Sequence, residues 1–346
     1  MYMNRCPADP FYIGTYSGGI YRCRLPEPVA LAAEAPAPAF LAMHPRAPFL
    51  YAAGECPEGS VGAWQIAGET GGLTFAGRTS SGGAFPCHVA LDATGSLLVA
   101  CNYADGTVAA IRILRSGGFG ETGVVLRHSG AGPNLQRQES PHPHGAFFAP
   151  DNRLVVVPDL ALDRLLLYRA GPTLEQADPP FVALSPGCGP RHFAFHPNGR
   201  LGYVLAEMES SVALVEWEPL VVHTAVSALP PGFRGESIAA EIAIDASGRF
   251  LYCSNRGADS IAVFAIGARG ELQAVQHISS GGRTPRHIAI DPTGEWLLAA
   301  NQDSDSIAVF RRDAASGMLS ICGFSIAVPA PACIVFCPSG TAVRRT

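Results

Sequence analysis

The sequence predicts an all-β fold, a seven-bladed β-propeller with four-stranded blades whose last blade is closed by strands from the N-terminus. Three observations predict this fold: a unit of about 47 residues recurs along the chain, its segments look like short β-strands, and the two chain ends together make up one unit. A repeat of this length with about four strands per unit is typical of propeller blades. We therefore expect residues 1–346 to form one closed domain.

Each unit is marked by a tight turn between its first two strands. The turns are HPRA at His44, DATG at Asp92, APDN at Ala149, HPNG at His196, DASG at Asp245, DPTG at Asp291 and CPSG at Cys337. Successive anchors lie 48, 57, 47, 49, 46 and 46 residues apart. The longest interval therefore carries an insertion, and insertions at a binding face commonly shape the pocket.

The segments beside the turns have the composition of β-strands. Residues 212–217 (VALVEW), 260–266 (SIAVFAI) and 306–312 (SIAVFRR) are short and rich in β-branched side chains. The seventh unit contains only its first strand, ACIVF at 332–336, and its turn. The N-terminal segments FYIGTY and GGIYRCRL supply the missing strands. Such a closure removes the free sheet edges that a linear array would expose.

Composition argues against several classes of function. Hydrophobic residues make up 48% of the chain and charged residues only 15%, the net charge is −5, and no basic cluster is present. Nucleic acid and membrane surfaces are therefore not expected partners. All 24 basic residues are arginine, which excludes a Schiff-base lysine. No signal-peptide core, membrane-length apolar stretch or CxxC pair is evident, so we expect a cytoplasmic protein with buried thiols, monomeric or weakly homo-oligomeric.

Propeller geometry should gather polar side chains at one end of the ring. The start of each first strand and the end of each second strand lie on the same face, opposite the turn that joins them. The first group contributes His88, His144, Arg191, His192, Glu241, Arg286 and His287, and the second contributes Tyr16, Glu55, Tyr103, Glu207 and Arg256. Polar and ionisable groups that converge in this way predict a ligand site.

One long motif resembles a known family. Residues 187–212, GCGPRHFAFHPNGRLGYVLAEMESSV, resemble the signature of the seven-bladed propeller lactonases, which include the bacterial propeller-type 6-phosphogluconolactonases and the fungal 3-carboxy-cis,cis-muconate lactonizing enzymes. Segments 85–108, 129–153, 239–261 and 284–307 agree with the family in the expected order. The resemblance implies catalytic candidates at His144, Arg191, Glu207 and Arg256. The chain departs from the family in having Ala206 and Gly54, where relatives usually have Asn, before Glu207 and Glu55.

These residue types suit the hydrolysis of an anionic lactone. The reaction needs a base that activates water and donors that hold the oxyanion. We expect Glu207 or His144 to be the base and Arg191 and Arg256 to bind the carbonyl oxygen or anionic groups, with Arg286 in support. The best expected substrate is 6-phosphogluconolactone, giving 6-phosphogluconate. No cofactor or metal is expected, since the HxH pair His142 and His144 is a weak metal motif.

Two other functions remain open at this stage. A cycloisomerase that forms a lactone from a carboxymuconate needs the same acid–base groups and arginines. A non-catalytic propeller scaffold would tolerate Glu207→Gln.

Structural interpretations stand beside the functional ones. His88, His192 and His287 could bond the backbone of a neighbouring blade, and Arg191 could bridge blades through an ion pair with Glu207 or Glu241. Glu241 suits either a structural or a binding role. Asp163, Asp259 and Asp305, at polar tips after the second strands, are expected to be solvated.

Overall fold

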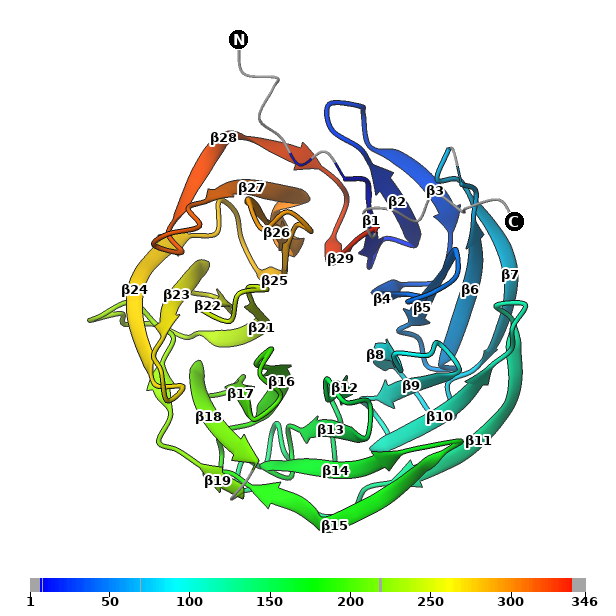
Figure 1. The fold of residues 1–346 in the computed structure, drawn as a ribbon, viewed down its shortest axis with the longest axis horizontal. Helices are drawn as coiled ribbons and strands as arrows, with labels where there is room; N and C mark the ends of the chain where they lie inside the picture. The colour runs from blue at the N-terminus through cyan, green and yellow to red at the C-terminus, as the bar shows by residue number, and fades with distance from the viewer. Residues whose placement is uncertain (1–6, 8, 69, 218–219, 338–346) are drawn as a thin grey trace.

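The computed structural model forms a ring of seven antiparallel β-sheets around a central axis, as the repeat predicts (Figure 1). It describes residues 7, 9–68, 70–217 and 220–337. Most of the seventh turn, CPSG, and Cys6 lie outside these residues. Within the described part of the chain the regular structure is β-strand, with one 3-10 turn, η1 (Gln302–Ser304).

In six of the seven sheets the strands follow chain order from the axis outward. The first three are β4 (Pro38–Met43), β5 (Phe49–Gly54), β6 (Ser60–Ile66) and β7 (Leu73–Ser80); β8 (Pro86–Leu91), β9 (Leu97–Asn102), β10 (Thr107–Ile113) and β11 (Phe119–Arg127); and β12 (Phe147–Phe148), β13 (Leu154–Asp159), β14 (Arg164–Ala170) and β15 (Leu174–Ala183).

The next three sheets follow the same order. They are β16 (Pro190–Phe195), β17 (Leu201–Ala206), β18 (Ser211–Trp217) and β19 (Leu220–Val222), with β20 (Val226–Ser227) also paired to β18; β21 (Ile238–Ile244), β22 (Phe250–Arg256), β23 (Ser260–Ile266) and β24 (Leu272–Ser279); and β25 (Pro285–Ile290), β26 (Trp296–Asn301), β27 (Ser306–Arg312) and β28 (Leu319–Ala327).

The last blade joins the two ends of the chain. Its order is β29 (Pro331–Phe336), β1 (Phe11–Thr15), β2 (Gly19–Cys23) and β3 (Ala30–Glu34). The innermost strand β29 pairs antiparallel with β1, with Ile13 opposite Ile334 and Phe11 opposite Phe336. The closure predicted from the divided repeat is therefore confirmed.

The hydrophobic core lies between neighbouring blades. One buried cluster joins Tyr51 and Val61 of one sheet to Leu98 and Ile111 of the next. The tyrosine of the second strand also carries a hydrogen bond across the interface: the hydroxyl of Tyr51 donates to the carbonyl oxygen of Gly117 at 2.8 Å. Tyr12, Tyr203 and Tyr252 donate in the same way to Gly71, Gly270 and Gly317. These contacts hold the blades in a fixed angular order.

A register shift recurs where the innermost strands begin. In the blade of β16, Pro190 pairs with Ala206 and His192 with Leu205, so Arg191 between them has no cross-strand partner. The residue before the proline, Gly189, has a φ of 62°, a left-handed conformation that glycine adopts without steric cost. A bulge re-aims the side chain of its extra residue. The same shift occurs at Cys87 and Arg286.

Three aspartates hold these strand starts to the preceding blade. The carboxylate of Asp163 accepts hydrogen bonds from the backbone N–H groups of Gly187 at 2.6 Å and Gly189 at 2.9 Å. Asp259 and Asp305 accept from the equivalent N–H groups of Thr284 and Ala330, each at 2.8 Å. The expectation that these aspartates are solvated was wrong for Asp163, which is buried, whereas Asp305 is exposed. Each of the three carboxylates also caps an N–H group that the turn leaves without a strand partner.

Replacing Asp163 should disturb both stability and the segment that carries Arg191. Asp163→Asn puts an amide donor where the carboxylate accepts two backbone N–H groups, so we expect a loss of about 1–3 kcal/mol in the free energy of unfolding. Urea denaturation measures this loss. Asp151→Asn is the matched control, since the exposed Asp151 accepts, among the described residues, only from Arg153 N. Equal stability of the two variants would contradict the assigned role.

Candidate active site

The centre of the site is the carboxylate of Glu207, which follows β17. Its Oε1 accepts a hydrogen bond from Arg137 Nη2 at 2.6 Å, and its Oε2 accepts one from Arg256 Nη2 at 2.8 Å. Arg191 Nε lies 3.1 Å from Oε2. The side chain is 3% exposed. One buried carboxylate therefore holds three guanidinium groups, two of which were expected at this site.

The arginines determine the ionisation of Glu207. Burial alone would raise the pKa of Glu207, but Arg256, Arg191 and Arg137 overcome this effect and lower it to about 2. The carboxylate is therefore charged at any physiological pH, and both oxygens already accept hydrogen bonds. Because the arginines already occupy both oxygens, Glu207 is poorly placed to take a proton from water.

His144 lies beside this carboxylate. Its Nε2 is 4.0 Å from Glu207 Oε2, and the innermost strand of this blade consists of the two residues of β12. Burial, and then the charge of Arg191, lower the pKa of His144 well below its ordinary value. The imidazole is thus neutral and able to accept a proton. Cys87, whose Sγ is 3.9 Å from His144 Nδ1, has a raised pKa through burial, so it is no thiolate nucleophile.

The sequence prediction missed Arg137. This residue lies in the insertion between β11 and β12, outside the repeat register on which the prediction depended. The loop is held by Gln138, whose side-chain amide donates to Leu160 O at 2.8 Å and to Asp163 Oδ1 at 2.9 Å. Asp163 therefore fixes both the loop that carries Arg137 and the turn that carries Arg191. The length of the insertion was the signal that could have directed attention to its one arginine between Pro133 and Pro141.

Other predicted residues border the Glu207 cluster. Tyr103 stacks on His142, with ring centroids 4.3 Å apart, and its ring centroid is 5.4 Å from that of His144. Farther round the ring, the hydroxyl of Tyr16 donates to Glu55 Oε2 at 2.7 Å. The guanidinium of Arg286 lies 4.9 Å from the centroid of the Tyr16 ring.

The remaining predicted residues form a buried group around Phe40. The rings of His88, His192 and His287 lie 4.0, 6.0 and 5.8 Å from the Phe40 ring. Glu241 Oε1 is 2.9 Å from His192 Nδ1, and its Oε2 is 3.3 Å from His287 Nε2. Burial raises the pKa of Glu241 and lowers that of His287 to about 4. Their predicted contact with substrate stays a prediction, and the structure shows these groups binding one another.

Arg191 connects the two groups. Its Nη1 donates to the carbonyl oxygen of Ala240 and lies 3.3 Å from His192 Nε2. The predicted ion pair with Glu207 is present, whereas Glu241 binds the histidines instead. The side chain is 4% exposed, so it is positioned by contacts on every side.

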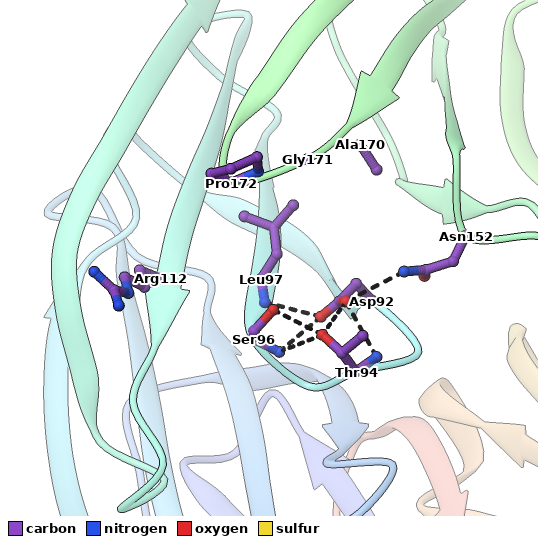
Figure 2. A pocket seen from close by; sticks show the side chains of 9 residues that line it. All are labelled: Asp92, Thr94, Ser96, Leu97, Arg112, Asn152, Ala170, Gly171 and Pro172. Atoms are coloured by element: carbon purple, nitrogen blue, oxygen red, sulfur yellow. Dashed lines mark hydrogen bonds between the residues drawn. The ribbon is translucent and has the colours of Figure 1, made fainter.

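A separate cavity opens at the other end of the blades, among the turns that follow the innermost strands. It has a volume of about 570 Å³ and is lined by Asp92, Thr94, Arg112, Asn152 and the backbone near Gly171 (Figure 2). The carboxylate of Asp92 accepts hydrogen bonds from its own turn, including Leu97 N at 2.8 Å, and from the Asn152 side chain at 3.3 Å. This network closes the turn between β8 and β9 and leaves the carboxylate bonded on both oxygens.

Among the residues that the structure describes, no group of three or more His, Cys, Asp or Glu side chains is arranged to hold a metal ion. In the same part of the chain, no helix has the length and apolar character needed to cross a lipid bilayer.

Comparison with known proteins places the chain among propellers of one kind. The model of the family described as "Lactonase, 7-bladed beta-propeller" matches residues 10–336. A Bacillus subtilis protein named 6-phosphogluconolactonase is 35% identical over 344 residues, which cover 94% of this chain and 97% of that protein.

Solved structures agree with this placement. The periplasmic gluconolactonase of Pseudomonas aeruginosa superposes with a TM-score of 0.88 and 29% identity, covering 95% of this chain and 98% of that one. A Lactobacillus plantarum protein superposes with a TM-score of 0.87 and 30% identity, covering 95% and 99%.

The ionisation of Glu207 should appear in the pH dependence of stability. Because its pKa falls from 4.5 to about 2 on folding, the charged carboxylate stabilises the fold above pH 4.5, and this contribution, about 3 kcal/mol, is lost as the pH falls toward 2. We expect Glu207→Gln to be much less stable than wild type at pH 6 and the difference to shrink toward pH 3. Denaturant titrations at each pH measure it.

Glu175→Gln provides the matched control for this titration. Glu175 pairs with Arg169 at 3.5 Å but is 69% exposed, and exposed pairs contribute little. A gap between wild type and Glu207→Gln that stays constant from pH 6 to pH 3 would contradict the assigned ionisation.

Proposed function

Because the chain belongs to the family of seven-bladed β-propeller lactonases, we propose that it hydrolyses 6-phosphogluconolactone to 6-phosphogluconate. The name of the Bacillus relative supports this substrate, and the arginine-rich site suits an anionic lactone. The observation that carries the proposal is the Glu207 carboxylate, charged and clamped by three arginines, beside the neutral imidazole of His144. Its surroundings provide a candidate base and fixed cations, which ester hydrolysis needs in addition to the attacking water.

We assign the base to His144 rather than to Glu207. The neutral imidazole of His144 has a ring lone pair to receive the proton, whereas both carboxylate oxygens of Glu207 already accept hydrogen bonds from Arg137 and Arg256. Glu207 instead orients the arginines and stabilises the imidazolium that forms when His144 takes a proton. This division of labour follows the logic of a histidine supported by a carboxylate.

The donors for the lactone carbonyl come from the same cluster. Both hydrogen bonds that the Arg256 side chain makes to described residues, to Glu207 and to Ala239 O, use Nη2, so its Nη1 remains available. The Arg256 side chain is 12% exposed, whereas Arg191 is 4% exposed. Arg256 is therefore the residue placed to meet the carbonyl oxygen, and Arg191 reinforces the positive potential behind it.

The reaction then proceeds in two steps. Water attacks the lactone carbonyl carbon, its proton passes to His144, and the charge on the former carbonyl oxygen is held by Arg256. The tetrahedral intermediate collapses, the bond between the carbonyl carbon and the ring oxygen breaks, and His144 returns the proton to that oxygen. The product carries a new hydroxyl and a carboxylic acid, which ionises into solvent.

The setting that we propose is the cytoplasm, with the protein acting as a monomer or weak homo-oligomer. Several cysteines, among them Cys101 and Cys253, are buried in the strands as small apolar side chains, which fits a compartment that keeps thiols reduced.

The proposal is tested with freshly generated 6-phosphogluconolactone, followed against its spontaneous hydrolysis. We expect wild type to exceed the spontaneous rate and His144→Ala to lose about 10²-fold or more in kcat. His223→Ala, which removes a surface histidine 44% exposed, should keep wild-type activity. A folded wild type with no rate above background would reject this substrate, and an active His144→Ala would reject the assigned base.

A further inference from the structure

Two of the blades have an arginine at the same position of the repeat, in the same backbone conformation. The segments Gly-Pro-Arg-His and Thr-Pro-Arg-His place Arg191 and Arg286 after the proline that begins β16 and β25. In both blades the strand register shifts around the arginine and leaves it without a cross-strand partner. Gly189 and Thr284, which precede the prolines, have φ values of 62° and 56°. Arg286 is therefore the structural equivalent of Arg191.

The two arginines differ in the residue opposite them. Glu207 follows β17, and its N–H donates to Gly189 O at 2.7 Å; Gln302 follows β26, and its N–H donates to Thr284 O at 3.0 Å. The two positions are thus equivalent, but a neutral amide replaces the carboxylate. Arg191 has a carboxylate oxygen 3.1 Å away, and the blade of Arg286 offers no such group at that position.

No other described residue supplies the missing negative charge by direct contact. Among the residues that the structure describes, none forms a hydrogen bond or an ion pair with the Arg286 side chain, which lies over the ring of Tyr16. The nearest acidic group around the ring, Glu55, accepts the hydroxyl proton of Tyr16 instead. Burial alone would lower the pKa of Arg286, but its electrostatic interactions, among them those with Glu55 and Glu207, overcome this effect and raise the pKa, so Arg286 keeps its charge. A half-buried guanidinium without a counter-ion is a receptor for an anion.

This receptor and the catalytic cluster lie within electrostatic reach of each other. Arg286 depresses the pKa of both Arg191 and Arg256, and Glu207 in turn acts on Arg286. The Glu207 carboxylate is shared among Arg137, Arg191 and Arg256, whereas Arg286 stands apart from that arrangement. Arg256 ends β22, Arg286 lies at the start of β25, and these two strands of neighbouring blades pack together. A ligand that spans the two blades at this end of the ring would meet Arg256 with its carbonyl group and Arg286 with a second, anionic group.

We propose that Arg286, backed by Tyr16 and Glu55, is the binding site for the phosphate group of the substrate and sets the preference for a phosphorylated over an unphosphorylated sugar lactone. This inference rests on the proposed lactonase function and adds to it the residue that recognises the anion. Tyr16 holds the guanidinium by stacking, and Glu55 fixes Tyr16 without neutralising the arginine. The absence of a carboxylate at Gln302 keeps the guanidinium free for the phosphate oxygens.

The first test compares two substrates, 6-phosphogluconolactone and glucono-1,5-lactone, in wild type and Arg286→Gln. We expect KM for the phosphorylated lactone to rise about 10- to 100-fold, the scale of a lost charged hydrogen bond, with kcat little changed and the unphosphorylated lactone unaffected. Arg311→Gln is the matched control, because Arg311 lies over the Trp296 ring at 5.5 Å in the same blade but on its exposed surface. It should leave both substrates unchanged.

The second test keeps Arg286 and supplies the carboxylate that its blade lacks. Gln302→Glu places a carboxylate opposite Arg286, as Glu207 does opposite Arg191. The new carboxylate should pair with Arg286 and compete with the phosphate group for it. We expect the same selective rise in KM for 6-phosphogluconolactone, without loss of any packing around Tyr16. Binding of 6-phosphogluconate, measured by calorimetry, should weaken in both variants, while binding of gluconate should not.

The outcomes separate this inference from the function on which it rests. Two results would overturn the assignment of Arg286 and leave the lactonase function standing. In the first, wild type hydrolyses both lactones with equal kcat/KM. In the second, the variants remain folded by circular dichroism but lose activity on both lactones in parallel. A wild type inactive on both lactones would instead reject the function itself. If Arg286→Gln fails to fold, Gln302→Glu decides the question, because a selective loss supports the inference and an unchanged preference overturns it.

Discussion

The pairing of β29 with β1 is the constraint on which the rest of the molecule depends. It joins strands from opposite ends of the chain and makes the seven sheets a closed ring. Once the ring is closed, the start of every innermost strand and the end of every second strand face the same part of the axis. Residues more than a hundred positions apart, such as His144 and Arg256, then act on one carboxylate. The repeat produces the seven blades, and closure of the ring brings the side chains of the candidate site together.

Within this frame the blades share a backbone and differ in side chains. The position held by Glu207 in one blade is occupied by Tyr16, Glu55, Tyr103 and Gln302 in four others, each with the same backbone hydrogen bond to the start of its innermost strand. The common fold therefore provides equivalent positions, and in our proposal their side chains differ in role, with Glu207 in the catalytic cluster and Gln302 leaving Arg286 free to bind an anion. The aspartates that cap the left-handed turns hold these places at fixed angles.

How far the sequence could predict the molecule depends on what the repeat encodes. The repeat predicted the ring, the blades and the closure, and it brought Arg191, Glu207 and Arg256 together because their positions recur in every unit. Arg137 was not predicted because it lies in an insertion that has no counterpart in the other repeat units. Asp163 was misjudged because its partners belong to the next blade. Whether His144 or Glu207 is the better base required distances between side chains, since composition shows that charges are present and not how they neutralise one another.

The central claim is that a neutral His144, kept so by burial and by Arg191, activates water beside a permanently charged Glu207. The pH dependence of kcat/KM for lactone hydrolysis tests it most directly, because that ratio reports the ionisation of the free enzyme. The account predicts a constant value from pH 7.5 downward, with a decline only well below pH 6.5, the ordinary pKa of histidine. A decline centred at or above pH 6.5 would show that the imidazole is protonated near neutrality and would contradict the account.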